Sequence, residues 1–279
     1  MIEEKPGRQG RPNNDNGREP PAGSNHRLAD DLVMGLRLYS RLPTGDRPHE
    51  KPNLSRIAMA LPLASLVIGL LPAALLLGAS FIGLPHLFAA GIAVAASILV
   101  SGAMAEDALA DSADGLFGGG TRERRLEIMK DSRHGTYGVA ALCTLLLLRA
   151  AALAAMAAIQ PVAAAALWLA AMLLARSGSL WLSVSLPTAR PDGLSASVGR
   201  ISWRAFGLGA IFALILGLIL AGPWVGFLGY LVGLVLIAIV AWLWGRFCRR
   251  MVGGQTGDLI GALQALIEIT ALGTFLLFV

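Results

Sequence analysis

The chain has 279 residues, of which 55% are hydrophobic and only 15% are charged, and its mean hydropathy is +0.64. Soluble domains carry about 25% charged residues, so this composition excludes a soluble enzyme with one aqueous surface and indicates a polytopic membrane protein. The two cysteines exclude a disulfide scaffold, and the 33 glycines lack the three-residue period of collagen.

The amino-terminal part divides into a tail and a short helix. Residues 1–26 contain four prolines and few apolar side chains, which predicts a disordered tail because too little apolar surface is available for burial. Residues 27–279 are predicted to form one transmembrane domain. Its first segment, residues 28–42, has apolar residues at helical spacing between charged ones, which favours a helix in the membrane interface over a linker helix in water.

Seven apolar blocks follow, each with roughly the 17–25 residues that a helix needs to cross a bilayer core. They span residues 57–80, 84–105, 137–159, 161–182, 205–222, 224–244 and 259–279. Alanine and glycine are abundant in these blocks, and small residues let helices pack closely in lipid. The sequence therefore predicts an all-α fold, a polytopic integral membrane helix bundle with about seven transmembrane helices.

Basic residues give the spans an orientation. Of 23 lysines and arginines, 21 lie in four segments, namely residues 1–56, 106–136, 183–204 and 245–258, and the connections that alternate with them carry none. Seven crossings place all four segments on one face, which the positive-inside rule makes cytoplasmic. Because 17 of the 18 acidic residues lie in the same segments, we expect the chemistry on the cytoplasmic side.

The densest polar cluster begins at Glu106 and lies where the second span reaches the cytoplasm. Asp107, Asp111 and Asp114 are spaced i, i+4, i+7, so they share one face if the helix continues. Carboxylates about 6 Å apart repel by about 3 kcal/mol at an effective dielectric constant of about 20. Mg²⁺, which prefers oxygen ligands and usually brings a phosphate substrate, relieves this repulsion. We predict that Glu106, Asp107, Asp111 and Asp114 form a metal site rather than a solvated helix end.

A second charged group precedes the third span. Lys130, Asp131 and Arg133 lie beside the start of that span, where an arginine can hold phosphate oxygens with two parallel hydrogen bonds. His134 is a weaker candidate, because a lone histidine near the end of a span is more often structural. Part of this charge run is expected to be a solvated helix face.

The last span carries polar residues that are costly in lipid and therefore face the bundle interior. Glu268 is expected to meet a partner such as Arg149 or Arg176, and Gln264, four residues before it, shares its face. Asp258 is expected to act separately, at the cytoplasmic mouth. A purely structural ion pair between helices is an equal alternative for the buried charges.

Several common sites are missing from the sequence. It has no P-loop, dinucleotide fingerprint, zinc signature or recognisable catalytic triad. The basic loops lack interleaved aromatic residues, which argues against nucleic-acid binding.

The central motif resembles that of a known family. The run Glu106 to Gly115, followed by Gly118-Gly119-Gly120 and by Leu126 to Gly135, is similar to the cobalamin synthases, also called adenosylcobinamide-GDP ribazoletransferases. Segments 36–43, 189–193 and 253–258 are similar to other motifs of that family, so that the resemblance covers the chain from about residue 28 to its end. Ala108 departs from the pattern, since the family usually has glycine there.

The resemblance implies a function. Members of this family transfer the phosphoryl group of adenosylcobinamide-GDP to α-ribazole or its 5′-phosphate, giving adenosylcobalamin or its 5′-phosphate and GMP, and they require Mg²⁺. We predict catalytic roles for Lys130, Asp131 and Arg133. Substrate binding is predicted for Arg41, Arg190, Asp258, Gln264 and Glu268, with contact to the metal cluster as an alternative for Asp258 and Glu268. The resemblance also implies a multi-pass protein of the bacterial cytoplasmic (inner) membrane whose active site faces the cytoplasm. A homo-oligomer is left open.

Two alternative functions stay open on the sequence. CDP-alcohol phosphotransferases also use an aspartate-rich helix end and a metal, but Ala110 stands where their motif has an arginine. Ion-coupled transporters place ionisable groups near the bilayer midplane, whereas the aspartates here cluster at the end of a span.

Overall fold

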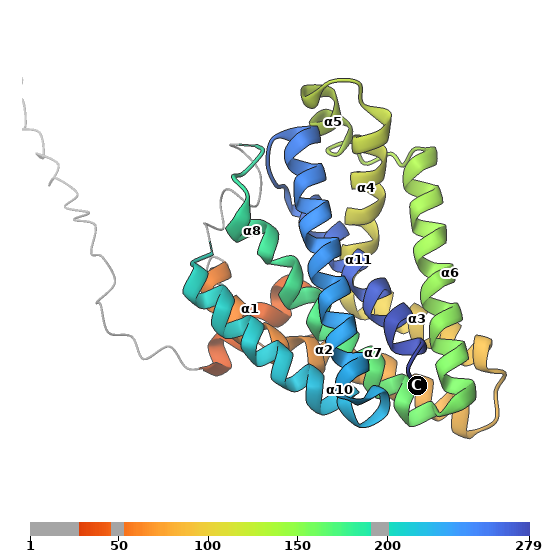
Figure 1. Ribbon diagram of the computed structural model, residues 1–279. Helices are drawn as coiled ribbons and strands as arrows, with labels where there is room; N and C mark the ends of the chain where they lie inside the picture. Colours follow the sequence, from red (N-terminus) through yellow and green to blue (C-terminus); the bar gives the residue numbers. More distant parts are fainter. Residues whose placement is uncertain (1–27, 46–52, 191–200) are drawn as a thin grey trace, which may run out of the picture.

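The computed structural model describes residues 28–45, 53–190 and 201–279, so the predicted tail over residues 1–26 lies outside the described part. The helices are α1 (Leu28–Tyr39), α2 (Leu54–Phe81), α3 (His86–Ser101), α4 (Met104–Gly118), α5 (Arg122–Ile128), α6 (Thr136–Ile159), α7 (Pro161–Ser179), α8 (Trp181–Ser185), α10 (Trp203–Val252) and α11 (Gly257–Leu276). The described residues form no β-sheet, which confirms the all-α prediction (Figure 1).

Five of the described helices are long and apolar enough to cross a membrane: α2, α6, α7 together with α8, α10 and α11. The α3 and α4 pair qualifies as one further span that is bent by 86° at its middle. Length and composition therefore give five or six spans, so the expected number of seven is approximate.

The α10 helix accounts for the difference. Its 50 residues would measure about 75 Å as one straight helix, more than twice the thickness of a bilayer core of about 30 Å. The backbone leaves the helical region at Gly226 (φ 68°, ψ 171°), a conformation that suits glycine. Figure 1 shows α10 as two diverging arms, cyan and blue. The predicted boundary at residues 222–224 is close, but the hinge is Gly226 rather than Pro223.

The second predicted span, residues 84–105, is interrupted. Gly102 (φ 67°) and Ala103 (φ 58°) both adopt the left-handed conformation, which a right-handed helix cannot contain. Ala103 is the one non-glycine residue with positive φ in the described part of the chain. The break ends α3 and starts α4 in a new direction, so the predicted aspartates lie on a separate helix.

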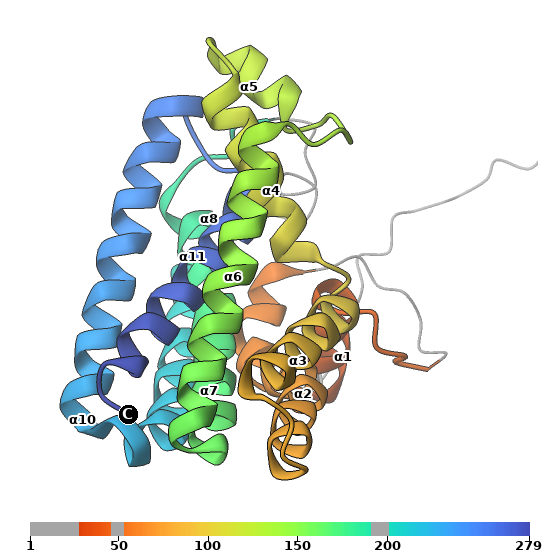
Figure 2. The same ribbon diagram turned by 90° about the vertical axis from the view of Figure 1, so that its right-hand side faces the viewer.

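The helix α7 is the centre of the bundle. It packs against α2, α6, α10 and α11, and its buried residues include six alanines, among them Ala164 and Ala171, both fully buried. Figure 2 shows α6 running alongside α4 and α7. Such small residues let the helices approach closely where lipid provides no hydrophobic drive for association.

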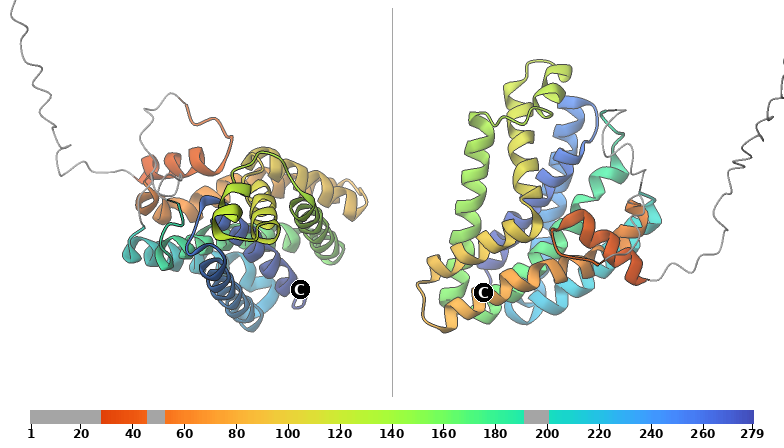
Figure 3. Two further views of the ribbon diagram at one scale, coloured as in Figure 1. Left: turned by 90° about the horizontal axis from the view of Figure 1, so that it is seen from above. Right: turned by 180° about the vertical axis from the view of Figure 1, so that it is seen from behind.

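The charged connections meet on one side of the bundle. Arg122 donates to the carbonyl of Ala189 (3.3 Å), and Arg125 donates to that of Met251 (3.2 Å). These contacts join the segments 106–136, 183–204 and 245–258. In the right-hand view of Figure 3, α5 and the adjacent end of α10 lie at the top, and the turn between α2 and α3 lies at the bottom. The structure therefore brings together three of the four segments that the charge pattern assigned to one face.

The predicted amino-terminal helix is present as α1 and is fastened to α2. Asp31 accepts a hydrogen bond from Arg56 (2.7 Å), and Met34 and Tyr39 are buried. These contacts place the carboxyl end of α1 beside the starts of α4 and α11, where a charged cavity opens.

Candidate active site

A cavity of about 680 Å³ lies between α1, the start of α4 and the start of α11. Arginines and aspartates both line it: Arg37, Arg41, Arg190, Asp107 and Asp258. Its remaining walls include backbone at Ser101, Gly102, Ala103 and Gly257. Acidic and basic side chains from distant parts of the sequence therefore share one space.

The break between α3 and α4 builds one wall of this cavity. The backbone N–H of Arg41 donates to the carbonyl of Val100 (2.8 Å), which fixes the chain after α1 to the end of α3. The Arg41 side chain then lies over Gly102, where a Cβ atom would come within 2.6 Å of its Nε. Glycine at position 102 therefore provides both the left-handed turn and the space for this arginine.

Three carboxylates at or beside the cavity interact with one another: Asp107 and Asp258 line it, and Asp111 does not. Asp107 and Asp111 are one helical turn apart on α4, and Asp258 at the start of α11 is close enough to interact electrostatically with both. His134 lies beside this pair, with Nε2 at 3.9 Å from Asp107 Oδ1 and Nδ1 at 3.7 Å from Asp111 Oδ1. His134, the weaker candidate in the sequence, therefore lies beside two of the predicted metal ligands. The one signal for it was its place in the long central motif.

The carboxylates at the cavity are suitable ligands for Mg²⁺ only together with a substrate. Within residues 28–45, 53–190 and 201–279, no three His, Cys, Asp or Glu side chains are grouped so as to hold a metal ion by themselves. Mg²⁺ usually takes only one or two carboxylates and completes its shell with water and phosphate oxygens. Asp107, whose side chain is 64% exposed, and Asp111 supply such a pair on one helix face. The chemistry of these residues fits Mg²⁺ bound together with a phosphate substrate.

Asp114 has a different environment from the other two aspartates. Its Oδ2 accepts from the N–H of Gly135 (2.6 Å) and its Oδ1 accepts from the N–H of Gly138 (2.9 Å). Both N–H groups belong to the first turn of α6 or the residue that precedes it, so Asp114 caps that helix. A Cβ atom on Gly135 would lie 2.6 Å from Asp114 Oδ1, which explains glycine there.

Asp114→Ala is therefore expected to act on stability. Loss of both acceptors should lower the free energy of unfolding by about 1–2 kcal/mol, the usual cost of removing a helix cap. The Mg²⁺ concentration that gives half-maximal turnover should stay unchanged. Chemical denaturation in detergent and a Mg²⁺ titration measure these quantities, and a raised Mg²⁺ requirement would return Asp114 to the metal ligands.

Glu106 points into the bundle rather than towards Asp107. Arg149 donates to Glu106 Oε1 (2.6 Å) and to Glu268 Oε2 (3.0 Å), and Trp168 donates to Glu268 Oε1 (2.9 Å). All four side chains are buried. The prediction that Glu268 meets Arg149 is confirmed. Glu106 belongs to the same buried network. It cannot face the cavity as Asp107 does, because adjacent helical residues point about 100° apart.

Gln264 and Asp258 also lie where the sequence predicted. Gln264 is buried on α11, one turn before Glu268. Asp258 lies at the mouth, where its Oδ2 is 3.8 Å from Arg190 Nη1 and accepts from Thr256 Oγ1 (3.3 Å). Asp258 therefore belongs to the charged cavity, whereas Glu268 does not line it.

The predicted catalytic group lies on the loop between α5 and α6. Arg133 and Asp131 form an exposed ion pair (2.7 Å), and neither they nor Lys130 line the charged cavity. Hydrogen bonds from Arg133 lower the pKa of Asp131 to about 2, so this carboxylate stays ionised near neutral pH and is a poor proton acceptor. A catalytic role for these three residues stays a prediction.

The segments around Ala189 and Gln255, far apart in the sequence, lie side by side next to the charged cavity. The N–H of Ala189 donates to the carbonyl of Gln255 (2.8 Å), and the N–H of Gln255 donates to the carbonyl of Pro187 (2.9 Å). Arg190 donates to the carbonyl of Leu126 (2.7 Å), which links the pair to α5. These contacts bring Arg190 and Asp258 to the cavity together.

The fold and the cavity define a polytopic, all-helical membrane protein in which carboxylates and arginines line one charged cavity. The sequence pattern of the cobalamin-5-phosphate synthase family matches residues 31–276. The chain therefore belongs to that family. No solved structure matches it.

Curated relatives support the assignment over most of the chain. A protein of Azorhizobium caulinodans is 43% identical over 256 residues, covering 90% of this chain and 97% of the relative. One of Xanthobacter autotrophicus is 44% identical over 263 residues, with coverage of 90% and 97%. One of Bradyrhizobium diazoefficiens is 43% identical over 244 residues, with coverage of 87% and 91%. Each of these relatives is named adenosylcobinamide-GDP ribazoletransferase.

Proposed function

We propose that this protein is a membrane-bound transferase that joins adenosylcobinamide-GDP to α-ribazole or its 5′-phosphate. The observation that carries this proposal is the charged cavity, in which Asp107 and Asp258 lie together with Arg41 and Arg190. A diphosphate needs both kinds of group, because its oxygens bind arginine directly and carboxylates through a divalent cation. Phosphoryl transfer depends mainly on such positioning and charge neutralisation.

The arginines of the cavity are the groups that hold phosphate oxygens directly. The Arg41 guanidinium has no hydrogen-bond partner among the described residues, so it is available to a ligand. Arg190 Nη2 donates to the Leu126 carbonyl, and Arg190 Nη1 is 3.8 Å from Asp258 Oδ2. These two contacts fix the orientation of the guanidinium in the cavity wall. Mg²⁺ held by Asp107 and Asp111 would neutralise charge on the diphosphate.

The proposed reaction is balanced without any further reactant. The ribose 3′-hydroxyl oxygen of α-ribazole forms a bond to the phosphorus next to cobinamide. The bond from that phosphorus to the bridging oxygen breaks, GMP leaves with that oxygen, and the hydroxyl proton goes to solvent. The cavity wall orients the diphosphate for displacement in line, which is the main contribution that a protein makes to this chemistry.

We place the protein in the bacterial inner membrane with the cavity open to the cytoplasm. The cavity lies on the side where the basic connections meet, and basic connections are normally cytoplasmic. Water-soluble nucleotide substrates would then enter from the cytoplasm, and the apolar turns would face the opposite side.

Cysteine labelling tests this orientation. Gly120→Cys and Gln160→Cys, each introduced after Cys143→Ser and Cys248→Ala, place single thiols before α5 and between α6 and α7. A membrane-impermeant maleimide should label the thiol at position 160 in intact cells and the thiol at position 120 only in inverted vesicles. The reverse pattern would contradict the proposed orientation.

The activity itself is tested with the purified protein in detergent. Adenosylcobinamide-GDP and α-ribazole should yield GMP and adenosylcobalamin in equal amounts, and chelation of Mg²⁺ should stop both. A CDP-alcohol with an alcohol acceptor should yield no CMP. Absence of GMP release, or release of CMP instead, would overturn the proposed function.

A further inference from the structure

A small recess adjoins the charged cavity and shares four lining residues with it: Leu38, Met104, Gly257 and Gly261. The recess lies deeper between α1, α11 and the junction of α7 with α8. Leu54, Leu180 and Ile260 make its other walls mainly apolar. A molecule whose charged part lies in the cavity could therefore extend an uncharged part into the recess.

Three polar side chains line this recess, and none has a hydrogen-bond partner among the described residues. Ser183 is only 4% exposed, and its Oγ is buried without a partner. Gln264 is 8% exposed and Tyr39 is 6% exposed. Burial raises the pKa of Tyr39 to about 12, so its hydroxyl stays protonated and able to donate. Buried polar atoms normally have partners, so the partnerless Ser183 Oγ, with Gln264 and Tyr39 beside it in the lining, indicates a ligand.

We propose that this recess binds the aromatic base of the α-ribazole acceptor, an inference that rests on the proposed function. The base is an uncharged dimethylbenzimidazole, whose ring and methyl groups suit walls of leucine, isoleucine and methionine. Its one free ring nitrogen accepts a single hydrogen bond, which Ser183, Gln264 or Tyr39 can donate. The ribose then lies at the opening, with its 3′-hydroxyl towards Asp107 and Asp258.

The other parts of the two substrates fit the recess poorly. Guanine has donors and acceptors around most of its edge, more than Ser183, Gln264 and Tyr39 can pair, and each group left unsatisfied against the apolar walls would cost about 1–3 kcal/mol. The corrin ring is many times larger than a bicyclic base, and its amide-bearing rim is polar. The recess has a volume of about 70 Å³, so it takes one edge of the base while the rest of the ring lies where the recess joins the charged cavity. Its size and its mainly apolar walls favour the acceptor base over both parts of the donor.

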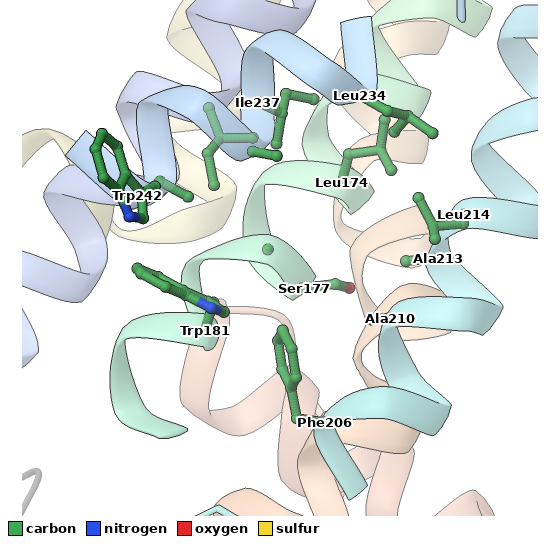
Figure 4. Close-up of a pocket in the computed structure, with 14 residues that line it drawn as sticks. Leu174, Ser177, Trp181, Phe206, Ala210, Ala213, Leu214, Leu234, Ile237 and Trp242 are labelled. Atoms are coloured by element: carbon green, nitrogen blue, oxygen red, sulfur yellow. The ribbon is translucent and has the colours of Figure 1, made fainter. Parts of the chain in front are cut away.

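A second apolar space serves as a comparison. It lies between α7 and the two arms of α10, and Figure 4 shows Ser177, Trp181 and Phe206 around it. It shares no lining residue with the charged cavity, so a base held there could not present its ribose to Asp107. Ser177 resembles Ser183 closely, because it is 4% exposed and its Oγ is buried without a partner.

Matched variants test the assignment by steady-state kinetics. Ser183→Val and Gln264→Leu should raise the KM for α-ribazole roughly tenfold, since each removes a buried donor. The KM for adenosylcobinamide-GDP should change less than about twofold. Two control variants make the same substitutions elsewhere: Ser177→Val in the second apolar space and Gln160→Leu at an exposed turn. Both should leave the two KM values unchanged.

A binding experiment covers the case in which these variants fold poorly. Ser183→Cys and Ser177→Cys are nearly isosteric, and each is made together with Cys143→Ser and Cys248→Ala. α-Ribazole should protect the thiol at position 183 from methanethiosulfonate, and GDP should not. The thiol at position 177 should react equally with and without α-ribazole.

The possible failures are distinguishable. If wild-type protein releases no GMP from adenosylcobinamide-GDP, the proposed function fails. If wild-type protein is active but GDP alone protects position 183, or the Ser183 and Gln264 variants raise only the KM for adenosylcobinamide-GDP, the assignment of the recess is wrong. Unchanged KM values together with no protection by α-ribazole would also overturn it.

Discussion

Asp107→Asn and Asp111→Asn are each expected to lower kcat roughly 10²–10³-fold, the range found when one preorganised electrostatic group is removed from an active site. Asparagine keeps the size of the side chain but removes the charge that Mg²⁺ requires of its ligands. Asp107 is mostly exposed, and asparagine keeps the volume of the largely buried Asp111 side chain (16% exposed), so neither change should disturb packing. Initial rates of GMP release measure the effect.

The comparison variant for this pair is Glu123→Gln on α5, which makes the same loss of charge at an exposed site outside the cavity. It should retain wild-type turnover. Thermal unfolding in detergent should be alike for all three variants and the wild type. Near-normal turnover in both aspartate variants would remove them from the proposed active site.

Arg149→Met is expected to be the most destabilising single change in the bundle. It leaves Glu106 and Glu268 buried without their ion-pair partner, and removal of one member of a buried pair typically costs about 3–5 kcal/mol. A loss of this size should lower Tm by roughly 10 °C for a chain of this length. Thermal unfolding followed by circular dichroism in detergent measures it.

Arg176→Met provides the matched comparison. Arg176 is also buried, but its Nε and Nη1 have no hydrogen-bond partner, so its removal should cost less than that of Arg149. Converting Glu106 and Glu268 to glutamine in a variant that carries both Arg149→Met and Arg176→Met should recover much of the lost stability. Arg176 also interacts electrostatically with both glutamates, and no buried charge then remains among the four residues. A larger loss for Arg176→Met than for Arg149→Met would contradict this account.

The spans and the buried ion pair could be predicted because each follows from the cost of polar groups in lipid. That cost makes the apolar blocks visible in the sequence, and it requires Glu268 to find a cation among the few in the spans. Arg149 and Arg176 are the two arginines within the predicted spans, so few partners were possible.

The break between α3 and α4 could not be predicted, because its local sequence favours a helix. Ala103 is a good helix former, and its left-handed conformation costs about 1–2 kcal/mol. Tertiary contacts determine the conformation there, including the bond from Arg41 to Val100 across distant parts of the chain. Without this break the cavity would lose the wall that it shares with α4.

The different environments of the three aspartates on α4 could not be predicted from the sequence either. Their i, i+4, i+7 spacing on one helix face suggested that Asp107, Asp111 and Asp114 act alike. The acceptors of Asp114 are instead satisfied by backbone 21 and 24 residues further along the chain. Helical spacing gives the face of a residue, but the neighbouring helix that meets that face decides its role.

The binding of Mn²⁺ in place of Mg²⁺, followed by electron paramagnetic resonance, tests the central claim most directly. Wild-type protein with adenosylcobinamide-GDP should hold Mn²⁺ in a complex whose spectrum differs from that of the free ion and of the ion with substrate alone. The Asp107→Asn/Asp111→Asn double variant should show no such complex, whereas Glu123→Gln should show it unchanged. An identical complex in the double variant would contradict the assignment of these two aspartates as the metal ligands.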